Sequence, residues 1–115
     1  MDSKNFRLLL KNKMDGFVHF IYKLSKKFPD DEKYNVTSQL RRATLSIILN
    51  FIEGFARNNK KVYLNFLKIS YGSLKEVEYL IDFSYKEKYI NVDEFQESQN
   101  QLDQIGKMLW VLIKQ

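Results

Sequence analysis

The 115-residue sequence contains no cysteine, one histidine, one proline and four glycines. Without cysteine the chain forms no disulfide and carries no thiol chemistry, which fits a reducing cytoplasm. Because His19 is the only histidine, a histidine-based metal site and a Ser–His–Asp triad are disfavoured, and an ordinary place on a helix surface is expected for it. No run of about twenty apolar residues occurs, and the three leucines at 8–10 are too few for a signal-peptide core. We therefore expect a cytoplasmic protein without a membrane span.

The sequence motifs of common enzyme classes are also missing. There is no glycine-rich phosphate loop, no zinc-ligand spacing and no nucleophile elbow. The carboxylate–histidine pattern of a di-iron bundle needs two Glu-x-x-His motifs, and the chain has none. Glu76 and Glu78 are two positions apart, and on a helix such residues point about 200° apart, away from a common site. We therefore predict that the protein is not an enzyme and has no catalytic residue, no cofactor and no metal.

The low content of proline and glycine, with 44% hydrophobic residues, predicts long helices joined by short connections. Apolar residues recur at alternating steps of three and four, the spacing of a helix face that is buried against other helices. The first such seam consists of Leu10, Met14, Phe17, Ile21, Leu24 and Phe28. We predict one domain, residues 1–115, with an all-α fold: an antiparallel up-down-up-down four-helix bundle with helices at about 5–27, 36–56, 61–88 and 92–113.

The segment 37–54 is apolar around much of its girth, so more than one neighbouring helix, or a second subunit, is expected to cover it. Its polar residues are informative, because an asparagine or glutamate inside an apolar segment needs a hydrogen-bond partner if it is buried. Simple solvent exposure and a ligand or catalytic site are two possible explanations. The interpretation we favour is a structural polar network, which reaches the next helix and consists of Arg41, Arg42, Asn50, Glu53 and Glu76.

Several short motifs carry a resemblance to a known family. They are KKFPDDEKY at 26–34, TSQLRRA at 37–43, the spaced positions Ser46-Ile47, Asn50 and Glu53-Gly54, and GSLKEVE at 72–78. In this order they resemble the 23S ribosomal RNA intervening-sequence proteins, a bacterial family of four-helix-bundle proteins, over roughly residues 14–90. One position departs from the pattern: the family usually has a proline where Ile48 stands, and a straighter central helix is expected here.

The resemblance implies a bacterial cytoplasmic protein connected with insertions in ribosomal RNA genes. The family is similar to the accessory variability proteins of diversity-generating retroelements, which are basic pentameric barrels that bind a reverse transcriptase and nucleic acid. By that similarity a ring-shaped homopentamer is expected, with RNA or DNA and a protein partner such as a reverse transcriptase as candidate partners, and with no membrane. A ring would multiply the weak phosphate contacts of each basic cluster.

The net charge of +5 is spread unevenly: +3 over residues 1–35, +3 over 36–60, +1 over 61–89 and −2 over 90–115. Lysine and arginine contacts to phosphates give binding that weakens steeply with salt and carries little sequence preference. We therefore predict a non-enzymatic basic helical bundle that binds the phosphate backbone of RNA or DNA as a homo-oligomer. The candidate nucleic-acid-binding residues form two clusters, Lys23, Lys26 and Lys27 in the first and Arg57, Lys60 and Lys61 in the second.

A competing hypothesis is a protein–protein interaction scaffold, or an assembly subunit, with no nucleic-acid role. The acidic last helix and the apolar edge at Met108–Trp110 fit that hypothesis, and the lysines would then only keep the surface solvated. Convergence of the two basic clusters on one end or face would favour nucleic-acid binding, and their dispersal would favour the scaffold.

Overall fold

A computed structural model describes residues 4–115 of the chain. Four α-helices account for most of it: α1 (Lys4–Ser25), α2 (Val36–Phe55), α3 (Lys60–Lys86) and α4 (Val92–Lys114). A short 3₁₀ helix, η1 (Asp30–Glu32), lies between α1 and α2. The first and third helices end about two residues earlier than the hydrophobic spacing indicated, and α2 runs through Ile48 without a break.

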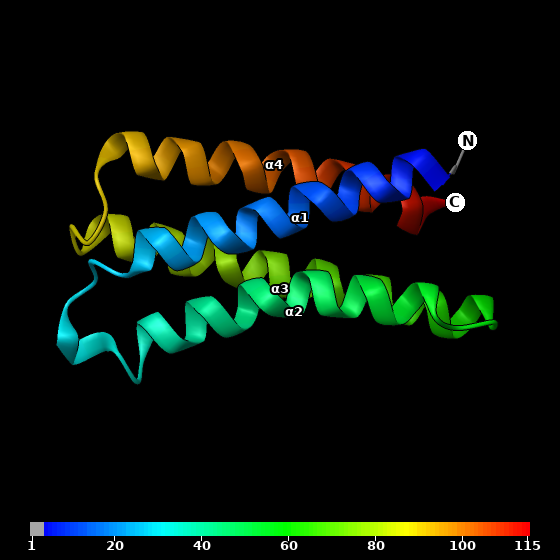
Figure 1. Cartoon of the computed structure of the whole chain (residues 1–115), viewed down its shortest axis with the longest axis horizontal. Coiled ribbons are helices and arrows are strands. Elements are labelled where there is room, and N and C mark those ends of the chain that lie inside the picture. The colour runs from blue at the N-terminus through cyan, green and yellow to red at the C-terminus, as the bar shows by residue number, and fades with distance from the viewer. Residues whose placement is uncertain (1–3) are drawn as a thin grey trace.

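The helices run alternately up and down along a body of 43 × 25 × 19 Å, and each packs against the next one in the chain, with α4 closing against α1 (Figure 1). This confirms the predicted all-α antiparallel bundle. The start of α1, the end of α4 and the α2–α3 turn lie together at one end (Figure 1). The segment with η1 and the α3–α4 turn lie at the other end (Figure 1). None of the described helices has the length and apolar content to cross a membrane.

The core is built from the predicted seams. All six apolar residues of the first seam are buried, and Leu102, Ile105 and Leu109 supply the matching face of α4. Apart from that of Thr37, which has no hydrogen-bond partner within residues 4–115, the buried hydroxyl groups bond to backbone carbonyls, usually the one four residues earlier, as Thr44 does to Leu40 at 2.7 Å and Ser98 to Glu94 at 2.8 Å. These bonds let a polar side chain enter the core without leaving its hydrogen-bonding capacity unmet.

Helices α2 and α3 pack closely because small residues line their contact. A Cβ added at Gly54 would lie 3.3 Å from both the Cβ of Phe66 and the carbonyl oxygen of Tyr63, so the absence of a side chain at Gly54 lets α3 approach α2 closely. The Ser70 hydroxyl donates to the Ile47 carbonyl at 2.6 Å across the same contact. Gly72 on α3 has no such role among residues 4–115, since a Cβ there would meet nothing within 4 Å.

The end of α3 and the start of α4 are each closed by a recognisable capping motif. Asn91 caps α4: its side chain accepts from the Glu94 N–H at 2.8 Å while the Glu94 carboxylate accepts from the Asn91 N–H at 2.9 Å. At the end of α3, Lys88 takes a left-handed conformation with φ of 66°, and the Tyr89 N–H donates to the Ser84 carbonyl at 2.8 Å. This is the hydrogen-bond pattern of a Schellman motif, with lysine where glycine is usual.

The single tryptophan of the chain lies on the outer side of α4. Trp110 is 45% exposed, and its ring lies 5.2 Å from that of Tyr71 on α3. The ammonium group of Lys114 lies 6.0 Å from the Trp110 ring centroid, within cation–π range.

Candidate nucleic-acid interface

The two basic clusters predicted from the sequence lie at opposite ends of the bundle. Lys23, Lys26 and Lys27 are at the carboxyl end of α1, whereas Arg57 and the lysines at 60 and 61 are at the turn between α2 and α3 (Figure 1). Because α1 and α2 are antiparallel, their carboxyl ends point in opposite directions. The six residues therefore do not form one surface within a single chain. This dispersal counts in favour of the scaffold hypothesis, and only the second cluster, with the cations that lie beside it, still supports nucleic-acid binding.

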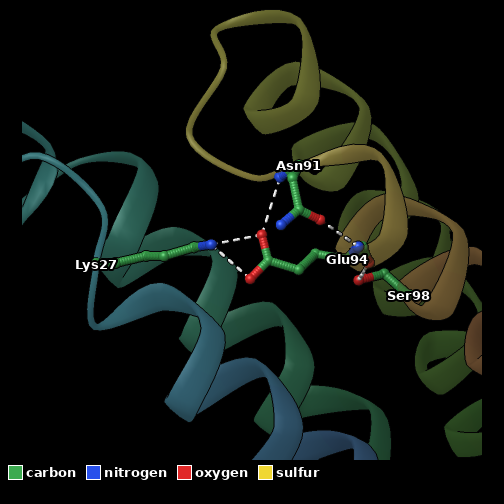
Figure 2. Close-up of polar contacts among 4 residues, drawn as sticks. All are labelled: Lys27, Asn91, Glu94 and Ser98. Carbon is green, nitrogen blue, oxygen red and sulfur yellow. Dashed lines mark hydrogen bonds and ion pairs between the residues drawn. The ribbon is translucent and has the colours of Figure 1, made fainter.

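The end that carries the first cluster has charges of both signs, and we call it the mixed end. Lys27 is bound by the Glu94 carboxylate, the same group that caps α4 (Figure 2). Partial burial acts to raise the pKa of Glu94, but the Lys27 and Asn91 hydrogen bonds outweigh it and hold that pKa below its ordinary value. The charged residues of the mixed end are Lys23, Lys26, Lys27, Lys33, Lys86 and Lys88 with Asp30, Asp31, Glu32, Glu87, Asp93 and Glu94.

A second polar contact also fastens the mixed end. The Tyr89 hydroxyl donates to the Glu32 carboxylate at 2.6 Å, which joins η1 to the α3–α4 turn. This hydrogen bond lowers the pKa of Glu32 and raises the pKa of Tyr89 to about 12, because it favours the carboxylate and disfavours the phenolate. Acids and hydrogen bonds therefore offset or occupy much of the positive charge around the first cluster.

The opposite end carries charge of one sign. Its charged side chains, among residues 4–115, are basic apart from Glu53, which lies one turn before Arg57 and pairs with it. Neither Lys60 nor Lys61 forms an ion pair with any residue that the structure describes, and both are exposed. We call this the basic end, and its cationic residues are Lys4, Arg7, Arg57, Lys60, Lys61 and Lys114.

Aromatic rings position the two guanidinium groups of the basic end. The Arg7 guanidinium carbon lies 4.6 Å from the ring centroid of Phe55, and that of Arg57 lies 5.0 Å from the ring of Phe66. Phe55 in turn packs on Tyr63 with ring centroids 5.0 Å apart. Stacking on a ring face leaves the edge of a guanidinium, which carries its N–H donors, able to point outward.

A cavity of about 350 Å³ opens at the basic end. Residues from all four helices line it, including Arg7 from α1, Arg57 and Asn58 from the turn, and Lys60 from α3. None of the lining residues is an aspartate or glutamate. The Asn59 side chain caps α3 by accepting from the Val62 N–H at 3.1 Å, and no acid lies in the first turn of α3. The side chains that line the cavity are therefore cationic or neutral.

The residues predicted to form a polar network are divided among separate contacts. Arg41 reaches α1, where its Nε donates to the Ser25 hydroxyl at 2.8 Å and a terminal nitrogen donates to the Tyr22 carbonyl at 3.2 Å. Asn50 donates to the carbonyl and hydroxyl of Ser46, both at 2.9 Å. The Ser46 hydroxyl lies 2.8 Å from that of Ser73, so this group does join α2 to α3.

The other three residues do not contact the first two. Glu53 is exposed and pairs along its own helix with Arg57, four residues on, instead of with Arg42. Arg42 and Glu76 are exposed and form no ion pair within residues 4–115, and Glu78 pairs with Lys75 at 3.4 Å. Helical spacing indicated which residues share a face, but local i, i+4 partners compete with partners on other helices.

Arg7, Lys4 and Lys114 were missed as members of the second cluster. The antiparallel topology alone could have found them, since it brings the beginning of the first helix and the end of the last helix to the α2–α3 turn. The same reasoning would have separated the two clusters. Within the described part of the chain, no group of three or more histidine, aspartate or glutamate side chains is arranged to hold a metal ion.

Comparisons with known proteins address the family directly. Curated proteins give no match. The structure is similar to the crystal structure of a protein of unknown function from the S23 ribosomal protein family of Bacteroides thetaiotaomicron VPI-5482, with a TM-score of 0.89 and 24% identity over 96% of this chain and 99% of that one. That likeness shows the fold. The family model described as 23S rRNA-intervening sequence protein matches residues 7–111, so the chain belongs to the 23S rRNA-intervening sequence protein family.

Proposed function

We propose that this protein is a non-enzymatic, cytoplasmic nucleic-acid-binding bundle that contacts the phosphates of RNA or DNA through its basic end. The observation that supports this is the concentration of cations from α1, α3, α4 and the α2–α3 turn at one end, with Glu53 as the only acid beside them among residues 4–115. Unpaired lysines are the groups that release counterions when they bind phosphates. The mixed end is not part of this surface, because acids offset its lysines.

The binding surface is multiplied if several copies assemble, and we propose a homo-oligomer. The outer side of α2 and α3 supports this: Leu49, three residues after Ser46, is 55% exposed, and Ile69, four residues before Ser73, is 45% exposed. Arg42 lies seven residues before Leu49, and Glu76 lies seven residues after Ile69, so each charge shares a helix face with one of the apolar residues. Arg42 and Glu76, which find no ion-pair partner within residues 4–115, can pair between copies.

The resemblance to the accessory variability proteins extends this proposal to a ring-shaped homopentamer and to a reverse transcriptase as protein partner. Light scattering coupled to size exclusion tests the assembly. A monomer at micromolar concentration contradicts the ring, and Ile69→Glu is expected to dissociate it because a carboxylate would enter the apolar contact beside Glu76. Asn100→Glu, on the exposed surface of α4 and so on a different helix from that contact, provides a control with the same added charge.

Fluorescence anisotropy tests nucleic-acid binding, with a structured RNA and a duplex DNA titrated across a salt series. We expect the logarithm of the association constant to fall linearly with the logarithm of the salt concentration, with a slope of about 0.7–0.9 per phosphate contact. The double variant Lys60→Ala/Lys61→Ala should flatten this slope and weaken binding at low salt. The matched variant Lys23→Ala/Lys26→Ala, which removes the same charge from the mixed end, should bind nearly as the unmodified protein does.

The exposed apolar residues of α2 and α3 also favour the second candidate function, a protein–protein scaffold. The same titration separates the two. If neither nucleic acid binds at low salt, the basic end is a solvated surface and the scaffold is the better explanation. Equal loss of binding in the two double variants would show that total charge, not the basic end, governs the association.

A further inference from the structure

The cavity at the basic end has a lining that differs from an ordinary basic surface. Three cationic side chains, Arg7, Arg57 and Lys60, border a single depression of about 350 Å³, and no carboxylate side chain is among the lining residues. Asn58 and Tyr63 add neutral donors and acceptors to the same wall. The convergence of three positive charges on one small volume indicates a ligand with concentrated negative charge.

The charge of the cavity fits a terminal phosphate better than an internal one. A phosphodiester inside a nucleic-acid strand carries one negative charge, whereas a phosphomonoester carries about −1.5 to −2 at pH 7 and has three acceptor oxygens. Arg57 uses one terminal nitrogen on Glu53 and keeps other N–H donors. The ring contact of Arg57 holds its guanidinium at the cavity wall, where its remaining N–H donors can form charge-assisted hydrogen bonds, and Arg7 adds a second guanidinium to the lining.

The dimensions of the cavity favour the end of a strand over its middle. A volume of about 350 Å³ is at the lower end of the range of small-ligand pockets, which starts near 300 Å³. Proteins that bind the middle of a single strand instead use a positively charged groove that follows the backbone over several nucleotides. The lining residues come from all four helices at the tip of the bundle, so the cavity can accept one nucleotide but offers no long track.

We propose that this cavity binds the 5′-phosphate end of a single-stranded nucleic acid. The 5′-phosphate lies among Arg7, Arg57 and Lys60, and the following backbone leaves over the exposed lysines of the basic end. This inference rests on the proposed function, since it names the part of the nucleic acid that the basic end recognises. It assigns different roles to two neighbouring lysines: Lys60 lines the cavity, whereas Lys61 lies on the outer face of α3 with Lys68.

The test compares one short single-stranded RNA in two forms, with a 5′-phosphate and with a 5′-hydroxyl. We expect the 5′-phosphate form to bind about tenfold more tightly at low salt, the effect of one or two charge-assisted hydrogen bonds. A nucleoside 5′-monophosphate serves as competitor and separates a strand end from a free nucleotide. It should displace the RNA only at concentrations far above that of unlabelled 5′-phosphorylated RNA, because it lacks the backbone contacts.

Two variants with the same change of charge locate the effect. Lys60→Gln should reduce or abolish the preference for the 5′-phosphate, because it removes a cation from the cavity. Lys61→Gln should weaken both RNAs by a similar factor and leave the preference intact. Both lysines are exposed, so both variants should fold, and circular dichroism checks this.

Each outcome decides between the proposals. Equal binding of the two RNAs to the unmodified protein would overturn the strand-end site and leave the proposed function standing. Absence of binding by either RNA at low salt would overturn the proposed function and this inference with it. Loss of the preference in both variants alike would overturn its assignment to the cavity. Competition by the free nucleotide at the same concentration as RNA would replace the strand end with a mononucleotide ligand.

Discussion

The two ends of the bundle hold their helices together by different means. At the mixed end, side-chain polar contacts join the elements: Lys27 binds Glu94, and Tyr89 donates to Glu32. At the basic end, apolar packing holds the helices together, through the close approach of α3 at Gly54 and the contact between the rings of Phe55 and Tyr63. An end stabilised by apolar contacts can therefore leave charged side chains available to a ligand. At an end stabilised by ion pairs, the charged side chains are already paired.

The largest expected effect is on the packing of the basic end. Gly54→Val adds a branched side chain where even a Cβ lies 3.3 Å from Phe66 and the Tyr63 carbonyl. Overpacking of this kind lowers the free energy of unfolding by about 1–3 kcal/mol. Thermal unfolding followed by circular dichroism measures it. Gly16→Val in α1 is the matched control, since nothing lies within 4 Å of that position, and it should be neutral or slightly stabilising. Equal loss in both variants would show that helix propensity, not the α2–α3 contact, sets the cost.

A smaller loss is expected when the polar contacts of the mixed end are broken. Glu94→Ala removes half of the capping box of α4 together with the partner of Lys27 (Figure 2). The loss of the cap and of a partly exposed ion pair should lower stability by about 1 kcal/mol. Glu97→Ala removes the same charge from the exposed face of the same helix, where Glu97 only accepts from Gln101 at 2.8 Å. It should change the midpoint of urea unfolding far less, and the reverse order would refute the role given to Glu94.

The pH dependence of stability should also belong to the mixed end. Because the pKa of Glu32 in the folded protein is below its ordinary value of 4.5, its contribution is complete above pH 4.5 and is lost as pH falls through the folded value. The pKa of Tyr89 is raised from 10.0 to about 12, so its contribution is complete below pH 10 and is lost as pH rises toward 12. Tyr89→Phe should remove the alkaline dependence. Glu32→Gln should reduce both, as melting temperatures across pH would show.

The smallest expected effect tests whether repulsion among the positive charges of the basic end lowers the free energy of unfolding. Lys60→Glu reduces repulsion among Arg7, Arg57 and Lys60 and places an acid in the first turn of α3, which the helix dipole favours. At low salt it should raise stability by about 0.5 kcal/mol while weakening nucleic-acid binding. Lys26→Glu changes charge equally just past the end of α1, where the dipole favours a cation, and should bring no gain. A loss of stability in Lys60→Glu would show that Lys60 has a structural role.

Much of the fold follows from residue spacing. The seam from Leu10 to Phe28 predicted the buried face of α1, because such a seam depends only on neighbours within one helix. Apolar character alone does not predict burial: Ile69 is 45% exposed, since the packed face of α3 is centred on Leu67, Ser70 and Leu74. Spacing defines a face to within about one residue, and the neighbouring helices decide which edge is covered.

The candidate site was harder to predict because it depends on which chain segments meet. Arg41 was expected to pair with an acid on α3, but it lies on the side of α2 that faces α1 and bonds to Ser25. Arg57 was identified from the sequence, whereas its neighbour Arg7 lies fifty residues earlier and enters only through the antiparallel topology. A basic cluster in sequence thus predicts charge, and the fold determines whether acids offset it.

The position of Trp110 gives the protein an optical reporter of its own. It is the sole tryptophan, it is partly exposed, and the ammonium of Lys114 lies 6.0 Å from its ring. Lys114 is also one of the cations of the basic end. A phosphate that draws Lys114 away from the indole changes the electric field at the ring, and so the wavelength and intensity of its emission. Titration of unlabelled protein with unlabelled nucleic acid can therefore be followed in a fluorimeter, with Lys114→Gln as the variant in which the spectral change should disappear.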